Sequence, residues 1–175
     1  MEDQKSNFFF ARVFSDTNLY KVNLSSNQVF KYGAEVIIQS EFGLNIAVVT
    51  SFETSSEKHN MKSHPSGNLI RYANIEDKAK RLQLDKKSTS IKAEINVFVH
   101  QLNLEMNLTN ILIPLSEDSI CVYYTATERV DFRDLLIKLR NKYKSKIFLR
   151  QISSKDRQSS FLSSSDSFFY NSHSK

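Results

Sequence analysis

The chain has 175 residues, 40% of them hydrophobic and 25% charged, which is typical of a soluble globular protein with one domain or two small ones. It has no signal peptide and no apolar run near the roughly 18–20 residues of a membrane helix, so we expect a cytoplasmic protein without membrane insertion. The formal charge is +5, with the basic excess between residues 131 and 157, and the single cysteine excludes an internal disulfide.

The first fifty residues carry four short runs rich in β-branched and aromatic residues. These runs cover residues 7–14, 19–24, 35–39 and 44–49. Gly43 lies in the turn between the last two runs and can adopt the positive φ that a tight return requires. The pattern predicts a small antiparallel sheet or a partial barrel.

Residues 53–68 are polar, contain Pro65 and Gly67 and lack both periodicities, so we expect a loop or linker there. Beyond it, apolar residues at spacings of three and four predict one face of a long helix. These residues are Ile75, Ala79, Leu82, Ile91, Ile95, Phe98, Val99 and Leu102. The weaker middle at residues 85–90 predicts fraying or a kink.

Residues 106–113 and 120–126 predict an antiparallel strand pair. A second helix follows, with Asp131 as its predicted N-cap, Asp134 at the capping-box position and basic residues near its end. Residues 146–152 predict a final strand.

The predicted fold class is α+β, with a small antiparallel β subdomain followed by a helix-strand-strand-helix-strand layer. The expected boundaries are residues 1–68 for the β subdomain with its linker, 69–153 for the α+β core and 154–175 for a serine-rich tail. We expect the tail to be disordered, because it has too little apolar surface to offset the entropy of ordering.

Basic side chains along the second helix and the last strand are the candidate contacts for nucleic acid or a partner protein. They are Arg129, Arg133, Lys138, Arg140, Lys142, Lys144, Lys146 and Arg150. Such a run equally fits a solvated helix end that complements its own dipole. Asp131 and Phe132 are interpreted as structural, whereas Arg129 and Arg133 have no evident role in a core.

Other residues that could carry chemistry have simpler interpretations. His59 and His64 lie in the polar loop without a third metal ligand, and Cys121 is interpreted as a small packing residue in a strand. Tyr123 and Tyr124 are adjacent on that strand, so one must face away from the helices, either to stack on bases or as an ordinary half-buried tyrosine. The chain shows no catalytic set and no glycine-rich phosphate loop, so we expect neither an enzyme nor a small-molecule substrate.

Several segments, in order between about residues 30 and 157, resemble the YaaT (RicT) branch of the PSP C-terminal-domain family. The clearest are Leu104-Glu105-Met106, the segment at residues 124–135, which contains Arg-Val-Asp-Phe-Arg, and the segment Ile-Phe-Leu-Arg-Gln-Ile at residues 147–152. Residues 33–49 and 71–77 are similar to upstream segments of the family.

The resemblance implies a non-catalytic regulatory or adaptor protein in RNA processing or mRNA turnover, which binds RNA, an endoribonuclease or both. Its implied protein partners are ribonuclease Y and two small helical regulatory proteins. Bacterial members continue into a cysteine-rich arm linked to an iron–sulfur cluster, whereas residues 159–166 here contain neither glycine nor cysteine, so we expect no cofactor. A protein–protein scaffold without RNA contact is the alternative.

Overall fold

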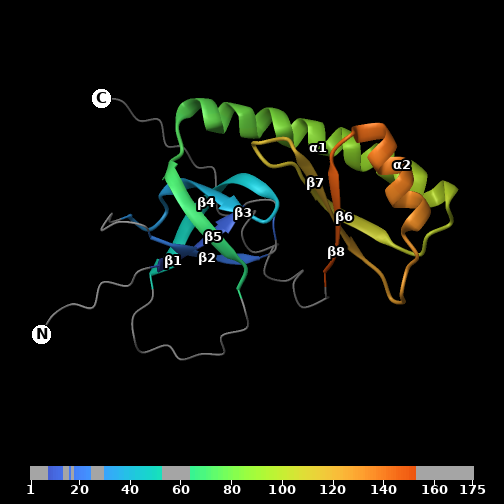
Figure 1. Cartoon of the computed structure of the whole chain (residues 1–175), viewed down its shortest axis with the longest axis horizontal. Helices are drawn as coiled ribbons and strands as arrows, with labels where there is room; N and C mark the ends of the chain where they lie inside the picture. Colours follow the sequence, from blue (N-terminus) through green and yellow to red (C-terminus); the bar gives the residue numbers. More distant parts are fainter. Residues whose placement is uncertain (1–7, 14–15, 17, 25–29, 53–63, 153–175) are drawn as a thin grey trace, which may run out of the picture.

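The computed structural model of the chain describes residues 8–13, 16, 18–24, 30–52 and 64–152. Figure 1 shows a β-barrel at one end and a three-stranded sheet with a second helix at the other, with one long helix running along both. The α+β class predicted from the sequence is confirmed. The tail at residues 154–175, His59 and most of the expected loop lie outside the described residues.

Five strands form the closed barrel, in the order β1-β2-β5-β3-β4. Their bounds are β1 Phe8–Val13, β2 Leu19–Asn23, β3 Glu35–Ser40, β4 Gly43–Phe52 and β5 Ser66–Tyr72. Alternate side chains of β1 and β2, such as Phe9, Ala11 and Tyr20, are fully buried and fill the interior, as the period of two along a strand requires. Closure pairs each of these strands on both sides.

Strand β5 begins at Ser66, so residues 66–68, which the sequence assigns to a loop, are in fact part of the barrel. It pairs parallel with β2 and antiparallel with β3. Gly67 is buried, and a Cβ there would already lie 3.4 Å from Ile38 Cδ1. A residue that usually signals a turn therefore serves close strand packing, and closure of the barrel overrides the local propensity.

Helix α1 (Ile75–Gln101) is one continuous helix, so the kink or fraying expected at residues 85–90 is absent. Asn74 caps it in a reciprocal capping box with Asp77, in which each side chain accepts from the other residue's backbone N–H at 2.8 Å. Ser88 is buried and donates to the carbonyl of Asp85, which accommodates the polar middle of the helix.

The buried face of α1 differs from the predicted one in its first half. Ile75 and Leu82 are 85% and 64% exposed, whereas Arg81 and Leu84 are buried. The guanidinium of Arg81 donates to the carbonyl of Ile113 at 2.8 Å and so fastens the helix to the end of the sheet. The predicted face is correct only in the second half, where the helix packs on the sheet.

The second part of the fold is a sheet in the order β6-β7-β8, with α2 connecting its two parallel strands. The bounds are β6 Asn107–Leu112, β7 Ser119–Thr125, α2 Arg133–Tyr143 and β8 Lys146–Gln151. The three strands agree with the sequence prediction to within about one residue at each end. Every residue of β7 except Thr125 is buried, as expected for a strand covered on both faces.

The central strand β7 lies between the helices and the barrel, so both of its faces are covered. Tyr124 packs among the residues beneath the helices, and Tyr123, as predicted, points the other way, into the core shared with the barrel. Both rings are buried, at 6% and 1% exposure. The possibility that one of them stacks on RNA bases is therefore excluded, because the barrel covers the sheet face where that ring would have been exposed.

The β3–β4 turn joins the barrel to the sheet. Ser119 Oγ donates to the carbonyl of Phe42 at 2.6 Å, and the backbone N–H of Leu115 donates to the carbonyl of Leu44 at 2.7 Å. Gly43, which closes this turn and begins β4, has a φ of +117°, and a Cβ there would lie 2.4 Å from Ser116 Oγ. The glycine is required both by its backbone conformation and by the closeness of the two parts.

Candidate basic surface on α2 and β8

Helix α2 begins without a side-chain cap, because its N-cap residue is Phe132 and not, as predicted, Asp131. The carboxylate of Asp131 accepts from the backbone N–H of Arg133 at 3.1 Å and from its guanidinium at 2.5–3.0 Å. Asp134 lies in the first turn, where its charge complements the helix dipole, but it forms no capping box. Asp131 thus has a structural role as predicted, but through its bonds with Arg133 and not as the N-cap.

Helix α2 ends at Tyr143. Its C-cap, Lys144, has a left-handed backbone with a φ of +52° and donates its N–H to the carbonyl of Arg140 at 3.0 Å. A non-glycine residue in this conformation costs about 1 kcal/mol. The left-handed residue reverses the chain within one residue, Ser145, before β8 begins. As a result the last turn of α2 and the start of β8 share one surface.

A hollow of about 610 Å³ lies between this last turn and β8. Arg140, Lys144 and Lys146 line it, together with Ser145, Ile147 and Phe148. No ion pair joins these three cations to a carboxylate within the described part of the chain. The hollow therefore combines apolar residues of β8 with three positive charges.

The other flank of α2 faces α1, and its cations are already engaged. The ammonium of Lys142 forms an ion pair with Glu94 at 2.7 Å, and the ammonium groups of Lys138 and Lys142 lie 5.6 and 5.3 Å from the centre of the Phe98 ring. The bonds that Glu94 accepts from Lys142 and from the hydroxyl of Tyr143 hold its pKa below the usual range. Sequence reasoning missed Glu94, which lies 48 residues before Lys142, because no local pattern links the two helices.

Arg129 and Arg133 precede and begin α2. Arg133 is 86% exposed, yet its guanidinium is held by Asp131, and this bond lowers the pKa of Asp131 to about 2. Arg129 is exposed and adds a smaller, purely coulombic lowering. Both residues extend the positive field of the surface, but Arg133 does so as half of an ion pair.

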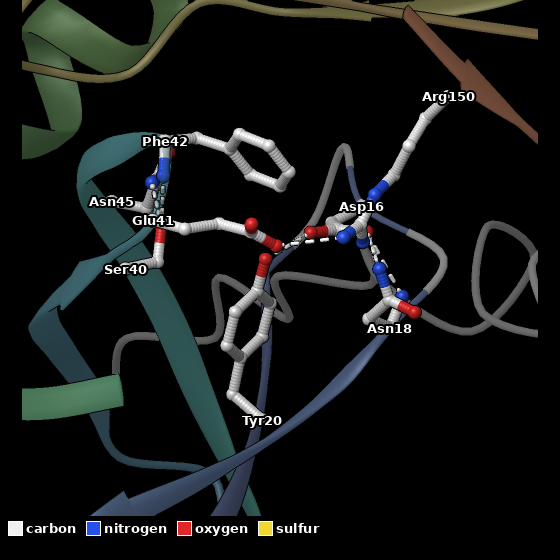
Figure 2. Close-up of polar contacts among 8 residues, drawn as sticks. All are labelled: Asp16, Asn18, Tyr20, Ser40, Glu41, Phe42, Asn45 and Arg150. Carbon is white, nitrogen blue, oxygen red and sulfur yellow. Dashed lines mark hydrogen bonds and ion pairs between the residues drawn. The ribbon is translucent and has the colours of Figure 1, made fainter. Parts of the chain in front are cut away.

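Arg150, the last of the predicted contacts, lies at the joint with the barrel. Figure 2 shows its side chain reaching from β8 to Glu41, with which it forms an ion pair at 2.7 Å. Its guanidinium also lies 4.9 Å from the centre of the Phe42 ring, which packs edge-on against Phe148. These contacts give Arg150 a structural role.

A buried polar cluster lies beside this joint in Figure 2. The carboxylate of Asp16, 5% exposed, accepts from the hydroxyl of Tyr20 and from the side-chain amide of Asn18. Burial and the neighbouring Asp16 raise the pKa of Tyr20, so its hydroxyl remains protonated. These contacts satisfy the buried carboxylate of Asp16 and give the cluster a structural role.

Cys121 is fully buried in the core shared by the sheet and the barrel, as the packing interpretation predicted. Burial raises the pKa of its thiol to about 12, so the thiolate that a nucleophile or metal ligand requires does not form at neutral pH. The described residues include no cluster of histidine, cysteine and carboxylate side chains suited to a metal ion. Neither helix in the described residues is long and apolar enough to cross a membrane.

Six of the eight predicted cations thus occupy three environments, whereas Arg129 precedes α2 and Arg133 begins it. The hollow collects Arg140, Lys144 and Lys146, the α1–α2 flank holds Lys138 and Lys142, and Arg150 belongs to the joint. The sequence analysis did not predict that Ile147 and Phe148 line the hollow. The alternation along a strand predicts its two faces, but it does not show which edge of the strand remains uncovered.

Comparison with known proteins places this surface in a family context. The family model for the PSP1 C-terminal conserved region matches residues 67–152, which extend from β5 to the end of β8. No curated protein and no solved structure matches the chain. The matched segment contains the whole α2–β8 surface, and residues 67–152 of the chain are a PSP1 C-terminal conserved region.

Proposed function

We propose that this protein is a non-catalytic, cytoplasmic regulatory adaptor in RNA processing, and that it binds RNA through the α2–β8 surface. The proposal is carried by one observation: three cations surround one hollow without a carboxylate partner in the described structure. Phosphates bind to positioned cations with no need for further chemistry, and neutralised side chains would contribute little.

The position of two of these cations on α2 supports the same proposal. Arg140 and Lys144 are four residues apart, so they lie on one face of the end of the helix and both line the hollow. Cations one helical turn apart have a spacing that suits a phosphate backbone. The resemblance to the YaaT branch supports RNA processing as the setting, with ribonuclease Y and its small helical regulators as proposed protein partners.

The test is RNA affinity measured against salt for a charge-reversed variant and a matched control. The double variant Arg140→Glu/Lys144→Glu should weaken binding of a mixed-sequence RNA at least about tenfold and flatten the dependence of affinity on salt. The control Lys31→Glu/Lys86→Glu changes the net charge equally at two exposed lysines away from the surface and should leave binding nearly intact. Equal losses in both variants would show that only net charge matters and would remove the proposal.

A protein scaffold remains a second candidate because of one feature at the opposite end of the molecule. Ile70, Tyr72, Ile75 and Leu82 are between 53% and 85% exposed along β5 and the first half of α1. Exposed large apolar side chains on neighbouring elements are typical of protein interfaces. A protein partner whose binding is insensitive to salt and is lost in Ile75→Ser/Leu82→Ser, but not in the α2–β8 variant, would favour this function.

A further inference from the structure

Strand β8 is an edge of the sheet, and the structure shows which of its backbone groups point outward. The N–H of Lys146 donates to the carbonyl of Asp118 at 3.1 Å, and the N–H of Ile152 donates to the carbonyl of Tyr124 at 2.8 Å. Alternate residues of a strand direct their backbone groups to opposite sides, so the even-numbered residues bond to β7. The N–H and C=O groups of Ile147, Leu149 and Gln151 therefore point to the open side.

The hollow described above lies at the start of this open edge. Arg140 and Lys144 border it from α2, and Lys146 and Phe148 border it from the strand itself. Phe148 is only half-buried, and its side chain lies on the barrel face of the sheet, opposite to Ile147. A chain lying along the edge would thus meet cations on the α2 side and an aromatic ring on the other side.

We propose that the open edge of β8 binds an extended acidic segment of a partner protein, which joins the sheet as a fourth strand. The outward N–H and C=O groups supply the main-chain bonds, and the surrounding side chains select the sequence. Because successive side chains of the added strand face opposite ways, the segment would carry carboxylates toward Arg140 and Lys144 and apolar side chains toward Phe148. The occupant follows from charge complementarity with the three cations of the hollow.

This inference goes beyond RNA binding, since phosphates require only cations whereas a strand requires directional backbone partners. Lysines on an edge strand can also simply prevent edge-to-edge association. The two roles differ in one measurable respect, which is whether the outward amides take part in binding. Gln151 offers a clean way to separate them.

The substitution Gln151→Pro removes one outward N–H without removing a bond to β7. Its control, Gln151→Ala, loses the same side-chain bond, from Nε2 to the carbonyl of Ala126, but keeps the backbone N–H. The probe is a peptide of alternating glutamate and valine, about ten residues long, enough to span β8. A peptide of alternating lysine and valine serves as the charge control.

The acidic peptide should bind the full chain and slow hydrogen exchange at the amides of Ile147, Leu149 and Gln151. Gln151→Pro should weaken binding at least about tenfold and Gln151→Ala less than about twofold, while both keep their thermal unfolding midpoints within a few degrees of each other. The lysine peptide should bind far more weakly. Circular dichroism and RNA affinity would show that the proline variant is folded.

Three results would overturn the inference. The acidic peptide could fail to bind, it could bind equally to the proline and alanine variants, or RNA rather than the peptide could be the ligand that the proline variant loses. Loss of peptide binding with RNA affinity retained separates this edge from the RNA surface. Failure of the peptide while Arg140→Glu/Lys144→Glu still abolishes RNA binding would leave the proposed function intact.

Discussion

The two ends of β8 carry the same kind of charge in opposite circumstances. At one end Arg150 meets Glu41 at 2.7 Å and lies over Phe42, and at the other end Lys146 borders a hollow with Arg140 and Lys144. The first cation joins two parts of the fold, whereas the others have no carboxylate partner in the described structure. A basic residue in a sequence is therefore a candidate contact only once its neighbours are known.

The largest effect should come from disrupting the β3–β4 turn, which contains the two residues that Arg150 contacts, Glu41 and Phe42. Gly43→Ala should lower the free energy of unfolding by about 3 kcal/mol, because a φ of +117° is strained for alanine and its Cβ would lie 2.4 Å from Ser116 Oγ. Gly33→Ala is the matched control, since its φ is +78° but no atom lies within 4 Å, and it should lose only about 1 kcal/mol. Urea denaturation of both variants measures the difference, and equal losses would contradict the role given to Gly43.

A smaller effect is expected when Arg150 itself is replaced. Arg150→Met should destabilise the fold by about 1 kcal/mol, because the ion pair with Glu41 is partly exposed and methionine keeps some of the packing against Phe42. RNA affinity should change less than about twofold, in contrast to the loss expected in Arg140→Glu/Lys144→Glu. A large loss of RNA affinity in Arg150→Met would place both ends of β8 in one binding surface.

At the other end of the strand, stability and binding should move in opposite directions. Lys144→Gly relieves the left-handed backbone at φ +52° and should raise the free energy of unfolding by about 0.5–1 kcal/mol, while it removes one cation from the hollow and weakens RNA binding. Lys144→Ala keeps the strain and loses the same charge, so it separates the two contributions. Chemical denaturation and RNA titration of both variants provide the readouts.

The smallest expected effect is a titration. The guanidinium of Arg133 holds the pKa of Asp131 at about 2, below its ordinary value near 4, so the ion pair stabilises the fold above pH 4 and the stabilisation is lost as the pH falls through about 2. In Arg133→Gln the pKa of Asp131 should return toward 4, as NMR of the carboxyl carbon would record. An unchanged pKa would mean that Arg133 is free to contact a ligand.

Much of the fold could be predicted from local patterns. The strands of the sheet followed from alternation, and α2 followed from its apolar stripe and dipole-complementing charges. In the N-terminal half of α1 the wrong residues were predicted to be buried, although the helical period alone shows the error. Ile75 and Ile91 are 16 residues apart, which is about 160° around a helix at 100° per residue, so both cannot face the same core.

The site was less predictable because its contacts are non-local. Glu41 and Arg150 lie 109 residues apart, and only the docking of the barrel on the sheet brings them together. The same docking buries Tyr123. The sequence predicted that either Tyr123 or Tyr124 faces away from the helices, but it indicated neither which one does so nor what covers it. The cationic run was visible in the sequence, but its division into a hollow, a helix flank and a joint depended on tertiary packing.

Because the barrel covers one face of the sheet, the segment that matches the family model is not a unit that can fold alone. Residues 67–152 match the family model, yet Leu112, Cys121, Tyr123 and Phe148 within them pack in the core shared with the barrel, and β5 is itself a barrel strand. Cut out and expressed alone, this segment would present a wide apolar sheet face and an unpaired strand to solvent. A transplant of residues 67–152 into another protein would therefore need a replacement cover for this sheet face.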